Sequence, residues 1–431
     1  MSSAALGVGL LGLGVVGGCV ATTLQERSEL LASQAGGPLD LRRVLVRDLG
    51  RPRPTSLAPG LLTTSPADLL EDPSIAVIIE TMGGEEPACS FVREALERGK
   101  HVITANKEMV AKHGQDLLAL AARREVEFRF EASVGGGIPL IAPLRQSLLA
   151  NRITGVRAII NGTTNYILSR MAAEGLDFQQ ALSAAQDLGY AEADPRLDVE
   201  GVDACYKLAI LASLAFHRPV DPGEVHCEGI THLTARDFRH ARELGYAIKL
   251  LAIAREEGGR LQVRVHPVFL HEQVLLAKVD GVFNAIEVEG DLVGQVIFYG
   301  RGAGPGPTAS AIIADLLEVA RGVRLGQGGG LLPGWRRLLG MLPMDELATR
   351  YYLRMSVADR PGVLAQIARV LGDNEISIAS VIQKEVDGTA QTAEIVIMTH
   401  LARERSFQMA LAELRTLDVV TEIGTYVRIE G

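Results

Sequence analysis

The chain of 431 residues has few aromatic residues, few cysteines and no excess of basic charge. Aromatic side chains make up 4% of it, and its four cysteines, at positions 19, 89, 205 and 227, include no CxxC pair. This spacing argues against a disulfide scaffold and a structural zinc site, and it fits a reducing, cytoplasmic setting. The 43 basic and 52 acidic residues give a formal net charge of −9, so we expect no broad nucleic-acid-binding surface.

The sequence also lacks a convincing targeting or membrane segment. Residues 2–25 are uncharged, but no basic stretch precedes them, and five glycines between Gly7 and Gly17 would weaken a membrane helix. Elsewhere the longest apolar run, 208–216, is too short to cross a bilayer. With 47% hydrophobic residues the chain is not disordered, and its length allows two to four domains.

Glycine, in contrast, is abundant, and its first cluster marks a candidate nucleotide site. The apolar run Leu6–Leu11 is typical of a buried strand and leads directly into GLGVVG, the GxGxxG fingerprint in the strand-then-helix context that it requires. The first glycine makes a tight turn, the second lets the backbone approach a pyrophosphate, and the third allows close packing of helix on strand. The predicted dinucleotide-binding residues here are Gly12, Gly14, Val15, Val16 and Gly17.

Strands and helices then alternate, as in a doubly wound parallel sheet. Strands are predicted at 41–46, 75–80 and 101–104, and a helix at 91–98. Arg47 and Asp48 end the first of these strands. An acidic residue there would bind the ribose of NAD and an arginine the 2′-phosphate of NADP, so the choice of cofactor stays open. Thr81 follows the strand at 75–80, where the carboxyl end of a parallel strand would face the cofactor.

Two polar stretches in the middle of the chain each allow two interpretations. EASVGGGIP, at 131–139, has three consecutive glycines, which form either a flexible turn or backbone lying close to a ligand. NGTTN, at 161–165, lies between a predicted strand at 156–160 and a predicted helix at 166–174. Such a turn can present amides and hydroxyls to a small polar ligand, or it can simply cap the helix.

A lysine inside an apolar helix is a candidate for chemistry. The loop before this helix holds Glu192, Asp194 and Asp198, and the helix carries Lys207. Asp203 lies four residues earlier, so the two side chains share a helical face. On an exposed helix such a pair is an ordinary surface contact. In an apolar setting, burial lowers the pKa of a lysine and a neighbouring carboxylate raises it, which can tune the pair for proton transfer.

Seven motifs occur in the order found in homoserine dehydrogenases, a family that the chain resembles over about residues 6–320. They are GLGVVG, ETMGG, TANK, EASVGGGIP, NGTTNYIL, GYAEADPRLDVEGVDACYK and GRGAGPGPTASAI. The resemblance implies an NAD- or NADP-dependent oxidoreductase that interconverts L-homoserine and L-aspartate 4-semialdehyde in the biosynthesis of threonine, methionine and isoleucine.

The resemblance also implies roles for single residues. The catalytic lysine of the family matches Lys207, and a second important lysine matches Lys107, which would face the nicotinamide and help to polarise the reacting oxygen. In the reducing direction Lys207 would donate a proton to the alkoxide that forms when hydride reaches the aldehyde carbon. The implied substrate-binding residues are Glu192, Asp198, Asp203, Thr163 and Gly162. Gly304, in the glycine-rich return to the nucleotide domain, is a further cofactor-binding candidate.

The family's monovalent-cation site, for sodium or potassium, falls on Glu131, Val134, Gly136 and Ile138. The ligands there are a carboxylate and backbone carbonyls. Gly136 replaces a residue that is often alanine, which matters little where the ligand is a carbonyl. The implied cation is structural.

A different composition after residue 321 indicates a separate module. Glycine-rich stretches mark a linker at 322–349, and beyond it the predicted elements follow the order βαββαβ. With the turn DRPGVL at 359–364 this order resembles an ACT domain, a small amino-acid-sensing module. The resemblance implies feedback control, with threonine as the first candidate effector; a dimerisation module without a ligand is the alternative. The candidate effector residues are Asp359, Gly362, Val363, Leu364 and Asn374.

These expectations describe an α/β chain with a Rossmann-type nucleotide-binding domain, an α+β catalytic and dimerisation domain, and a ferredoxin-like ACT domain. The predicted ranges are 1–130 completed by 300–321, then 131–299, the linker 322–349, and 350–431. We expect a homodimer or homotetramer that binds a small-molecule substrate and an amino-acid effector, with no nucleic-acid or membrane partner. The rival interpretations are another NAD(P)-dependent amino-acid or semialdehyde dehydrogenase and a non-enzymatic NAD(P) or amino-acid sensor. Lys207 with its neighbouring acids argues against both.

Overall fold

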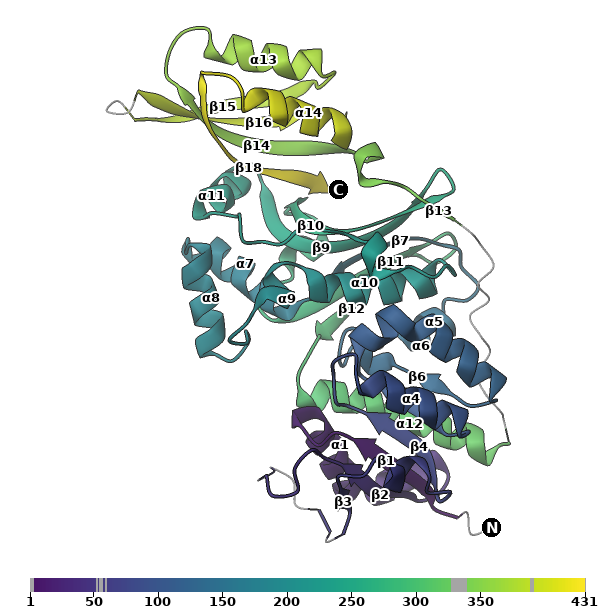
Figure 1. The fold of residues 1–431 in the computed structure, drawn as a ribbon. Coiled ribbons are helices and arrows are strands. Elements are labelled where there is room, and N and C mark those ends of the chain that lie inside the picture. Colours follow the sequence, from purple (N-terminus) through teal and green to yellow (C-terminus); the bar gives the residue numbers. More distant parts are fainter. Residues whose placement is uncertain are drawn as a thin grey trace. The chain divides into compact units, whose positions relative to one another are not determined.

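A computed structural model describes residues 4–51, 53, 57, 58, 60–326, 339–387 and 391–430. The chain forms two compact units, each assembled from three separate stretches (Figure 1). Unit 1 comprises residues 1–156, 206–225 and 286–338, and unit 2 comprises 157–205, 226–285 and 339–431. The division cuts across the domain ranges expected from the sequence, which stay predictions. Part of the predicted linker, 327–338, lies outside the described residues.

Unit 1 is built around a six-stranded sheet in the order β3-β2-β1-β4-β5-β6. Its strands are β1 (Leu6–Leu11), β2 (Leu39–Leu45), β3 (Leu62–Thr63), β4 (Ile75–Glu80), β5 (His101–Thr104) and β6 (Phe128–Arg129). All five pairings are parallel. The strand order reverses between β1 and β4, and the carboxyl ends of strands at such a point flank a ligand-binding crevice. The predicted doubly wound sheet is thereby confirmed.

Helices cover both faces of this sheet. On one face α1 (Val15–Glu26), α2 (Ser28–Ala35) and α12 (Pro305–Arg324) share a hydrophobic core with the alternate strand residues Val8 and Leu10. On the other face Leu69 of α3 (Ala67–Leu70) lies at Gly9. Next to α3 come α4 (Ala88–Glu97) and α5 (Lys107–Arg123). α12 is distant in sequence from β1 but shares its hydrophobic core, whereas the range 300–321 expected for the return of the chain stays a prediction.

The remaining parts of unit 1 follow the sheet or return to it. They include η1 (Glu131–Ser133), α6 (Ile141–Arg145), η2 (Pro222–Glu224) and β12 (Gly294–Arg301). The chain passes between the units within β7 (Ile153–Ile159), α10 (Val202–Ala215) and β11 (Phe283–Gly290).

Unit 2 contains a mixed sheet that includes strands of the ACT segment. Its strands lie in the order β9 (Tyr246–Glu257), β10 (Arg260–His271), β18 (Val420–Glu430), β14 (Ala348–Ala358), β16 (Thr392–Thr399) and β15 (Ile378–Asp387). β9 and β10 form a long antiparallel hairpin, and β18 pairs antiparallel with β14. β18 also pairs in parallel with β10, through residues 428–430 and 268–270. The ACT segment and the β9–β10 hairpin therefore belong to one sheet.

The helices of unit 2 fall into two groups. Those that precede the ACT segment are α7 (Gly162–Glu174), α8 (Phe178–Asp187), α9 (Arg196–Val199) and α11 (Ala235–Glu243). Within the ACT segment, α13 (Val363–Asp373) and α14 (Glu404–Leu414) pack with β14 around a core in which Tyr351 stacks on Phe407. The order β14-α13-β15-β16-α14-β18 confirms the predicted βαββαβ arrangement, to which β17 (Ala402–Arg403) is a short addition. Other short elements are β8 (His226–Cys227), η3 (Leu275–Lys278), β13 (Gly340–Met341) and η4 (Met344–Glu346).

Candidate active site

The loop between β1 and α1 exposes backbone at the crevice of the parallel sheet. Gly12 has φ +95°, a left-handed conformation that favours glycine. A Cβ on Gly17 would lie 2.2 Å from the Gly12 carbonyl oxygen, whereas a Cβ on Gly14, the N-cap residue of α1, would meet open space. The first amides of a helix have no acceptor within it. This loop therefore fits the phosphates of a dinucleotide at the helix N-terminus.

A buried carboxylate shapes the loop that follows β4. Glu80 is fully buried and accepts hydrogen bonds from the amides of Met82, at 2.6 Å, and Gly83, at 3.1 Å. Burial raises the pKa of Glu80. Thr81, which lies between Glu80 and Met82 in the sequence, donates a hydrogen bond from its hydroxyl to the Gly12 carbonyl oxygen at 3.0 Å. This bond fixes the loop after β4 against the glycine turn.

The N-terminus of α5 is tied to the same loop. Asn106 is the N-cap residue: its side chain accepts a hydrogen bond from the Met109 amide at 3.1 Å and donates one to the Gly84 carbonyl at 2.6 Å. Lys107 is the first residue of the helix. Its backbone therefore lies at the carboxyl edge of the sheet, and its role beside the nicotinamide stays a prediction.

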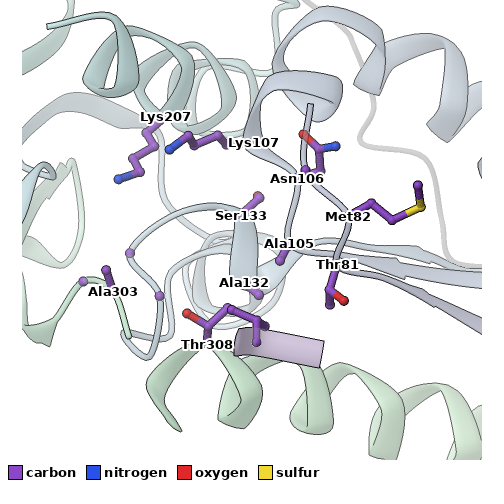
Figure 2. Close-up of a pocket in the computed structure, with 15 residues that line it drawn as sticks. Thr81, Met82, Ala105, Asn106, Lys107, Ala132, Ser133, Lys207, Ala303 and Thr308 are labelled. Carbon is purple, nitrogen blue, oxygen red and sulfur yellow. The ribbon is translucent and has the colours of Figure 1, made fainter. Parts of the chain in front are cut away.

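A pocket of about 270 Å³ in unit 1 brings several of the predicted residues together (Figure 2). The predicted residues that line it are Val16, Thr81, Lys107, Gly136 and Lys207. The sequence analysis did not single out other lining residues, namely Met82, Ala105, Asn106, Ser133, Ala303 and Thr308. Met82, Ala105 and Asn106 belong to ETMGG and TANK and follow predicted strands, whose ends could have indicated them. The others belong to EASVGGGIP and GRGAGPGPTASAI, which follow no predicted strand.

The two lysines come from different helices of unit 1. Lys107 extends from α5 and Lys207 from α10, and Figure 2 shows both side chains directed into the pocket. α10 is apolar as predicted, with Leu208 and Leu211 fully buried. Lys207 itself is half-buried, because it lines the pocket. Two ammonium-bearing side chains at one crevice can stabilise an anionic oxygen and exchange a proton with it.

The triple glycine lies against the return loop before α12. Gly135 and Gly136 have φ +74° and +55°, and a Cβ on Gly136 would lie 2.5 Å from the Gly302 carbonyl oxygen. The backbone here closely approaches another segment of the chain, and its approach to a ligand stays a prediction. Gly304, a predicted cofactor residue, is the N-cap of α12 next to the pocket-lining Ala303. Arg47 is exposed beyond the end of β2.

Glu131, the carboxylate of the predicted cation site, binds backbone amides. It is buried, and it accepts hydrogen bonds from the amides of Leu140, Ile141 and Ala142 at 2.5, 2.9 and 2.7 Å. Its own amide donates to Asp315 Oδ2 at 2.9 Å. Burial raises the pKa of Asp315 to about 7. The carboxylate thus already stabilises the chain from 131 to 142.

The cation itself stays a prediction. Among the described residues there is no group of three or more His, Cys, Asp or Glu side chains that could hold a metal ion. The predicted cation site is of another kind. Its ligands would be one carboxylate and the backbone carbonyl oxygens of Val134, Gly136 and Ile138. These three residues lie in the segment directly after Glu131.

In unit 2 one asparagine joins two of the predicted substrate-binding acids. Asn161 Nδ2 donates hydrogen bonds of 2.7 Å to Asp198 Oδ1 and of 2.7 Å to Asp203 Oδ2. Its Oδ1 accepts the Thr164 amide at 2.8 Å and so caps α7. Asn161 and Asp203 are both buried. The cap interpretation of NGTTN is correct, and the same side chain also organises the acids, which the sequence analysis missed.

The other predicted substrate residues lie on neighbouring segments of unit 2. Gly162 and Thr163 form the first turn of α7, and the Thr163 hydroxyl donates to the Tyr190 carbonyl at 2.8 Å. Glu192 is exposed in the connection between α8 and α9, whereas Asp198 is half-buried in α9. Asn161 therefore brings together two of the three predicted acids, and Glu192 lies on a more open segment.

One chain does not bring the predicted effector residues together. Gly362, with φ +88°, is the N-cap residue of α13, next to the buried Val363 and the exposed Leu364. Asp359 is exposed just before them. Asn374 is the C-cap residue of this 11-residue helix, so it lies about 16 Å along the axis from the turn.

Comparisons with known proteins identify the family. Family models of the homoserine dehydrogenase NAD-binding domain, homoserine dehydrogenase and the ACT domain match residues 12–131, 139–317 and 351–419. The chain is 44% identical to a homoserine dehydrogenase of Synechocystis, over 98% of this chain and 99% of the relative. The chain belongs to the homoserine dehydrogenase family. It is also 40% identical to the homoserine dehydrogenase of Bacillus subtilis, over 99% of each chain.

Solved structures agree with this identification. A homoserine dehydrogenase of Thiobacillus denitrificans has a TM-score of 0.93 at 44% identity, covering 99% of this chain and 98% of that one. A hyperthermophilic archaeal homoserine dehydrogenase, solved in complex with NADPH, has a TM-score of 0.63 at 27% identity and covers 73% of this chain and 98% of that one. The chain is thus an NAD(P)-dependent oxidoreductase acting on L-homoserine and L-aspartate 4-semialdehyde, and the rival interpretations are not favoured. Within the described residues no helix is long and apolar enough to cross a membrane.

Proposed function

We propose that this homoserine dehydrogenase uses the two lysines of the unit 1 pocket for proton chemistry and the acids around Asn161 for substrate binding. The observation that carries the proposal is that Lys107 and Lys207 line one pocket beside the glycine turn. α10 contributes to both sets, because it carries Asp203 in its first turn and Lys207 one turn later. The same helix thus carries the proposed proton donor and a proposed substrate-binding carboxylate.

The glycine turn supports the cofactor assignment. Gly12, Gly14 and Gly17 permit a close backbone approach, and the amides at the start of α1 would bind the phosphates. When bound, the nicotinamide cofactor supplies the hydride to the aldehyde carbon or accepts it from the alcohol. The cofactor is NADP or NAD. Arg47, exposed beyond β2, suits a 2′-phosphate, and Asp48 beside it suits a ribose hydroxyl.

The lysines act on the oxygen of the substrate. In the reducing direction Lys207, as an ammonium, donates a proton to the oxygen that becomes the alcohol, and Lys107 stabilises negative charge on it. In the oxidising direction neutral Lys207 takes the proton back. Asp198 and Asp203 supply negative charge for the α-ammonium group of the substrate, and Glu192 would add to it from its exposed segment.

Replacing Lys207 by methionine tests this assignment. We expect kcat to fall about 10²- to 10⁴-fold, the range of general acid–base catalysis, while the affinity for NADPH, measured by fluorescence titration, is retained. Lys278→Met, at an exposed lysine in unit 2, is the matched control and should keep its activity. Near-normal turnover of Lys207→Met would overturn the assignment, and a larger loss in Lys107→Met would exchange the two roles.

We also propose that the ACT segment binds an amino-acid effector, with threonine as the first candidate, and that the protein is a cytoplasmic homodimer or homotetramer. The family match at 351–419 supports the first statement. Because Asn374 and the turn 359–364 lie at opposite ends of α13, a site using both would need a second copy of the chain. A thermal-shift screen of the twenty amino acids tests the effector, and light scattering with and without the hit tests the assembly. A titration of sodium and potassium against activity tests the structural cation.

A further inference from the structure

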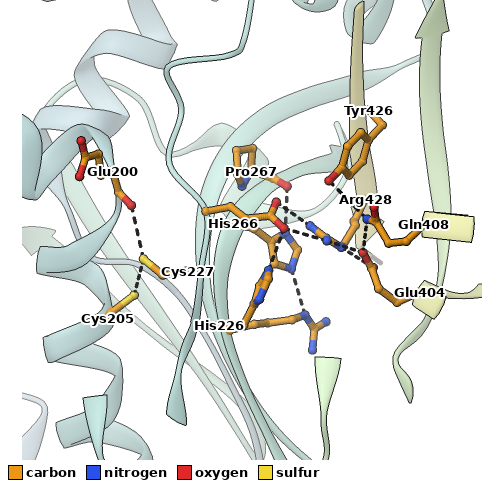
Figure 3. Close-up of polar contacts among 12 residues, drawn as sticks. Glu200, Cys205, His226, Cys227, His266, Pro267, Glu404, Gln408, Tyr426 and Arg428 are labelled. Atoms are coloured by element: carbon orange, nitrogen blue, oxygen red, sulfur yellow. Dashed lines mark hydrogen bonds and ion pairs between the residues drawn. The ribbon is translucent and has the colours of Figure 1, made fainter. Parts of the chain in front are cut away.

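Two cysteines of unit 2 lie in direct contact at the start of α10. The Cys205 thiol, in the first turns of the helix, donates a hydrogen bond to Cys227 Sγ at 2.7 Å (Figure 3). Cys227 Sγ in turn contacts the Glu200 carbonyl oxygen at 3.3 Å, just before the helix begins. Cys205 is buried and Cys227 is exposed. The reaction proposed above uses neither thiol.

Backbone contacts hold the two sulfurs together. Cys227 lies in β8, where it pairs with Val265 of β10, so its strand is anchored to the main sheet of the unit. Two residues further on, a Cβ on Gly229 would lie 2.3 Å from the Val199 carbonyl oxygen, and the Ile230 amide donates to that oxygen at 2.8 Å. This contact between backbones fixes β8 against the turn that precedes α10. The approach of the sulfurs is therefore built into the fold.

The electrostatics of the pair make the exposed sulfur the reactive one. The hydrogen bond that Cys205 donates lowers the pKa of Cys227, against burial and the charges of Glu228 and Glu200, which raise it. The same hydrogen bond, together with burial, raises the pKa of Cys205. A thiolate is the nucleophilic form of cysteine, so an accessible thiolate is accompanied by a buried thiol within reach.

We propose that Cys205 and Cys227 are a peroxide-responsive thiol pair that forms a reversible intramolecular disulfide. The Cys227 thiolate attacks hydrogen peroxide: an S–O bond forms, the O–O bond breaks, and hydroxide leaves with a sulfenic acid on Cys227. Cys205 then attacks that sulfur: the S–S bond forms, the S–O bond breaks, and the departing hydroxide takes the Cys205 proton as water. Each sulfur loses one electron, and the peroxide is reduced to two water molecules.

The geometry needs little change for this step. A disulfide places its sulfurs about 2.05 Å apart, so an approach of less than about 1 Å closes the bond. The other two cysteines are set differently: Cys89 is buried in α4, where burial raises its pKa, and Cys19 is half-buried in α1. Oxidation is therefore expected to select the pair.

Oxidation would also act on substrate binding, a consequence that rests on the role proposed for Asp203. Asp203 lies two residues before Cys205 in the first turn of α10. A bond from Cys205 to β8 would draw this turn toward the strand and shift the Asp203 carboxylate relative to Asn161. We expect a several-fold rise in KM for homoserine with KM for the nicotinamide cofactor unchanged.

The test treats the full-length protein with a small excess of hydrogen peroxide and measures its intact mass. A loss of about 2 Da, a peptide linking 205 to 227, and recovery with dithiothreitol are expected. Cys227→Ser should lose this product, and Cys89→Ser, the matched control, should keep it. The wild-type mass result stands even if a variant fails to fold.

Three outcomes would overturn the proposal. They are a gain of about 32 Da on Cys227 without a cross-link, a cross-link through Cys19 or Cys89, and a bond only between chains. A disulfide at 205–227 with unchanged homoserine kinetics would overturn its link to Asp203. Failure of the Lys207 assignment would appear in kinetics alone and leave the mass result intact, so the two proposals fail separately.

Discussion

Replacing Asn161 by aspartate tests how the acids of unit 2 are organised. The change keeps the shape of the side chain and the oxygen that caps α7, but it removes the two donors that reach Asp198 and Asp203 at 2.7 Å each. It also places a third carboxylate beside those of Asp198 and Asp203. Because Asn161 and Asp203 are both buried, water cannot replace the donor that Asp203 loses.

The size of the effect follows from these contacts. A hydrogen bond to a charged group contributes about 1.5–3 kcal/mol, so the loss of two such bonds costs about 3–6 kcal/mol before relaxation. Repulsion among the carboxylates adds to this cost at pH 8 and falls away as the pH is lowered and they take up protons. We therefore expect Asn161→Asp to be destabilised by at least about 3 kcal/mol at pH 8 and by clearly less at pH 5.5.

Thermal unfolding at the two pH values measures this difference, and homoserine KM reports on the acids directly. Asn161→Ser is the matched control, because serine also caps helices but adds no charge. Its deficit should depend on pH much less than that of Asn161→Asp. An Asn161→Asp protein with wild-type melting temperature and wild-type homoserine KM would refute the reasoning.

Three further predictions concern other contacts. Gly17→Ala places a Cβ 2.2 Å from a backbone carbonyl oxygen, so NADPH binding measured by fluorescence should weaken at least tenfold, whereas Gly372→Ala in α13, whose Cβ meets open space, should bind NADPH normally. Asp315→Asn removes a carboxyl group. Burial raises the pKa of this group to about 7, from an ordinary value of 3.8. As the pH rises from 4 to 8, the free energy of unfolding of the wild type should fall by up to about 4 kcal/mol relative to that of this variant. A difference in melting temperature between the two proteins that does not change with pH would contradict the raised pKa. Arg428→Met leaves the buried Glu404 carboxylate without its partner at 2.7 Å and should cost about 3–5 kcal/mol in urea unfolding, with exposed Arg369→Met as a neutral control.

Much of the fold could be predicted because its strands are short, apolar and bounded by glycine or polar residues. β1, β4 and β5 have the predicted bounds. β2 was predicted two residues late, since Leu39 and Asp40 belong to the strand although the pattern of burial there is irregular. The parallel pairing of β18 with β10 could not be predicted, because register between distant strands leaves no local pattern.

In the candidate site, too, some features could be predicted from local sequence and others depend on tertiary structure. The glycine turn and the two lysines follow from local motifs, and in the structure Lys107 and Lys207 line the same pocket. Glu80 reads in the sequence as the last residue of an apolar strand, and only the structure shows its carboxylate fixing the next loop. Asn161 was considered as a helix cap, but its two bonds to acids about 40 residues away depend on tertiary structure.

The pairing of β18 with β10 has a consequence for biosynthesis. β10 ends at His271 and β18 begins at Val420, so about 150 residues must be made before the edge at 268–270 finds its partner. At about 5–20 residues per second, that edge stays open for roughly 10–30 s on the ribosome. Unpaired strand edges are sites of misassociation, and long-range pairings form slowly. The parallel sheet of unit 1, in contrast, has all six strands by residue 129, and the return of α12 at 305–324 to one of its faces follows later in synthesis.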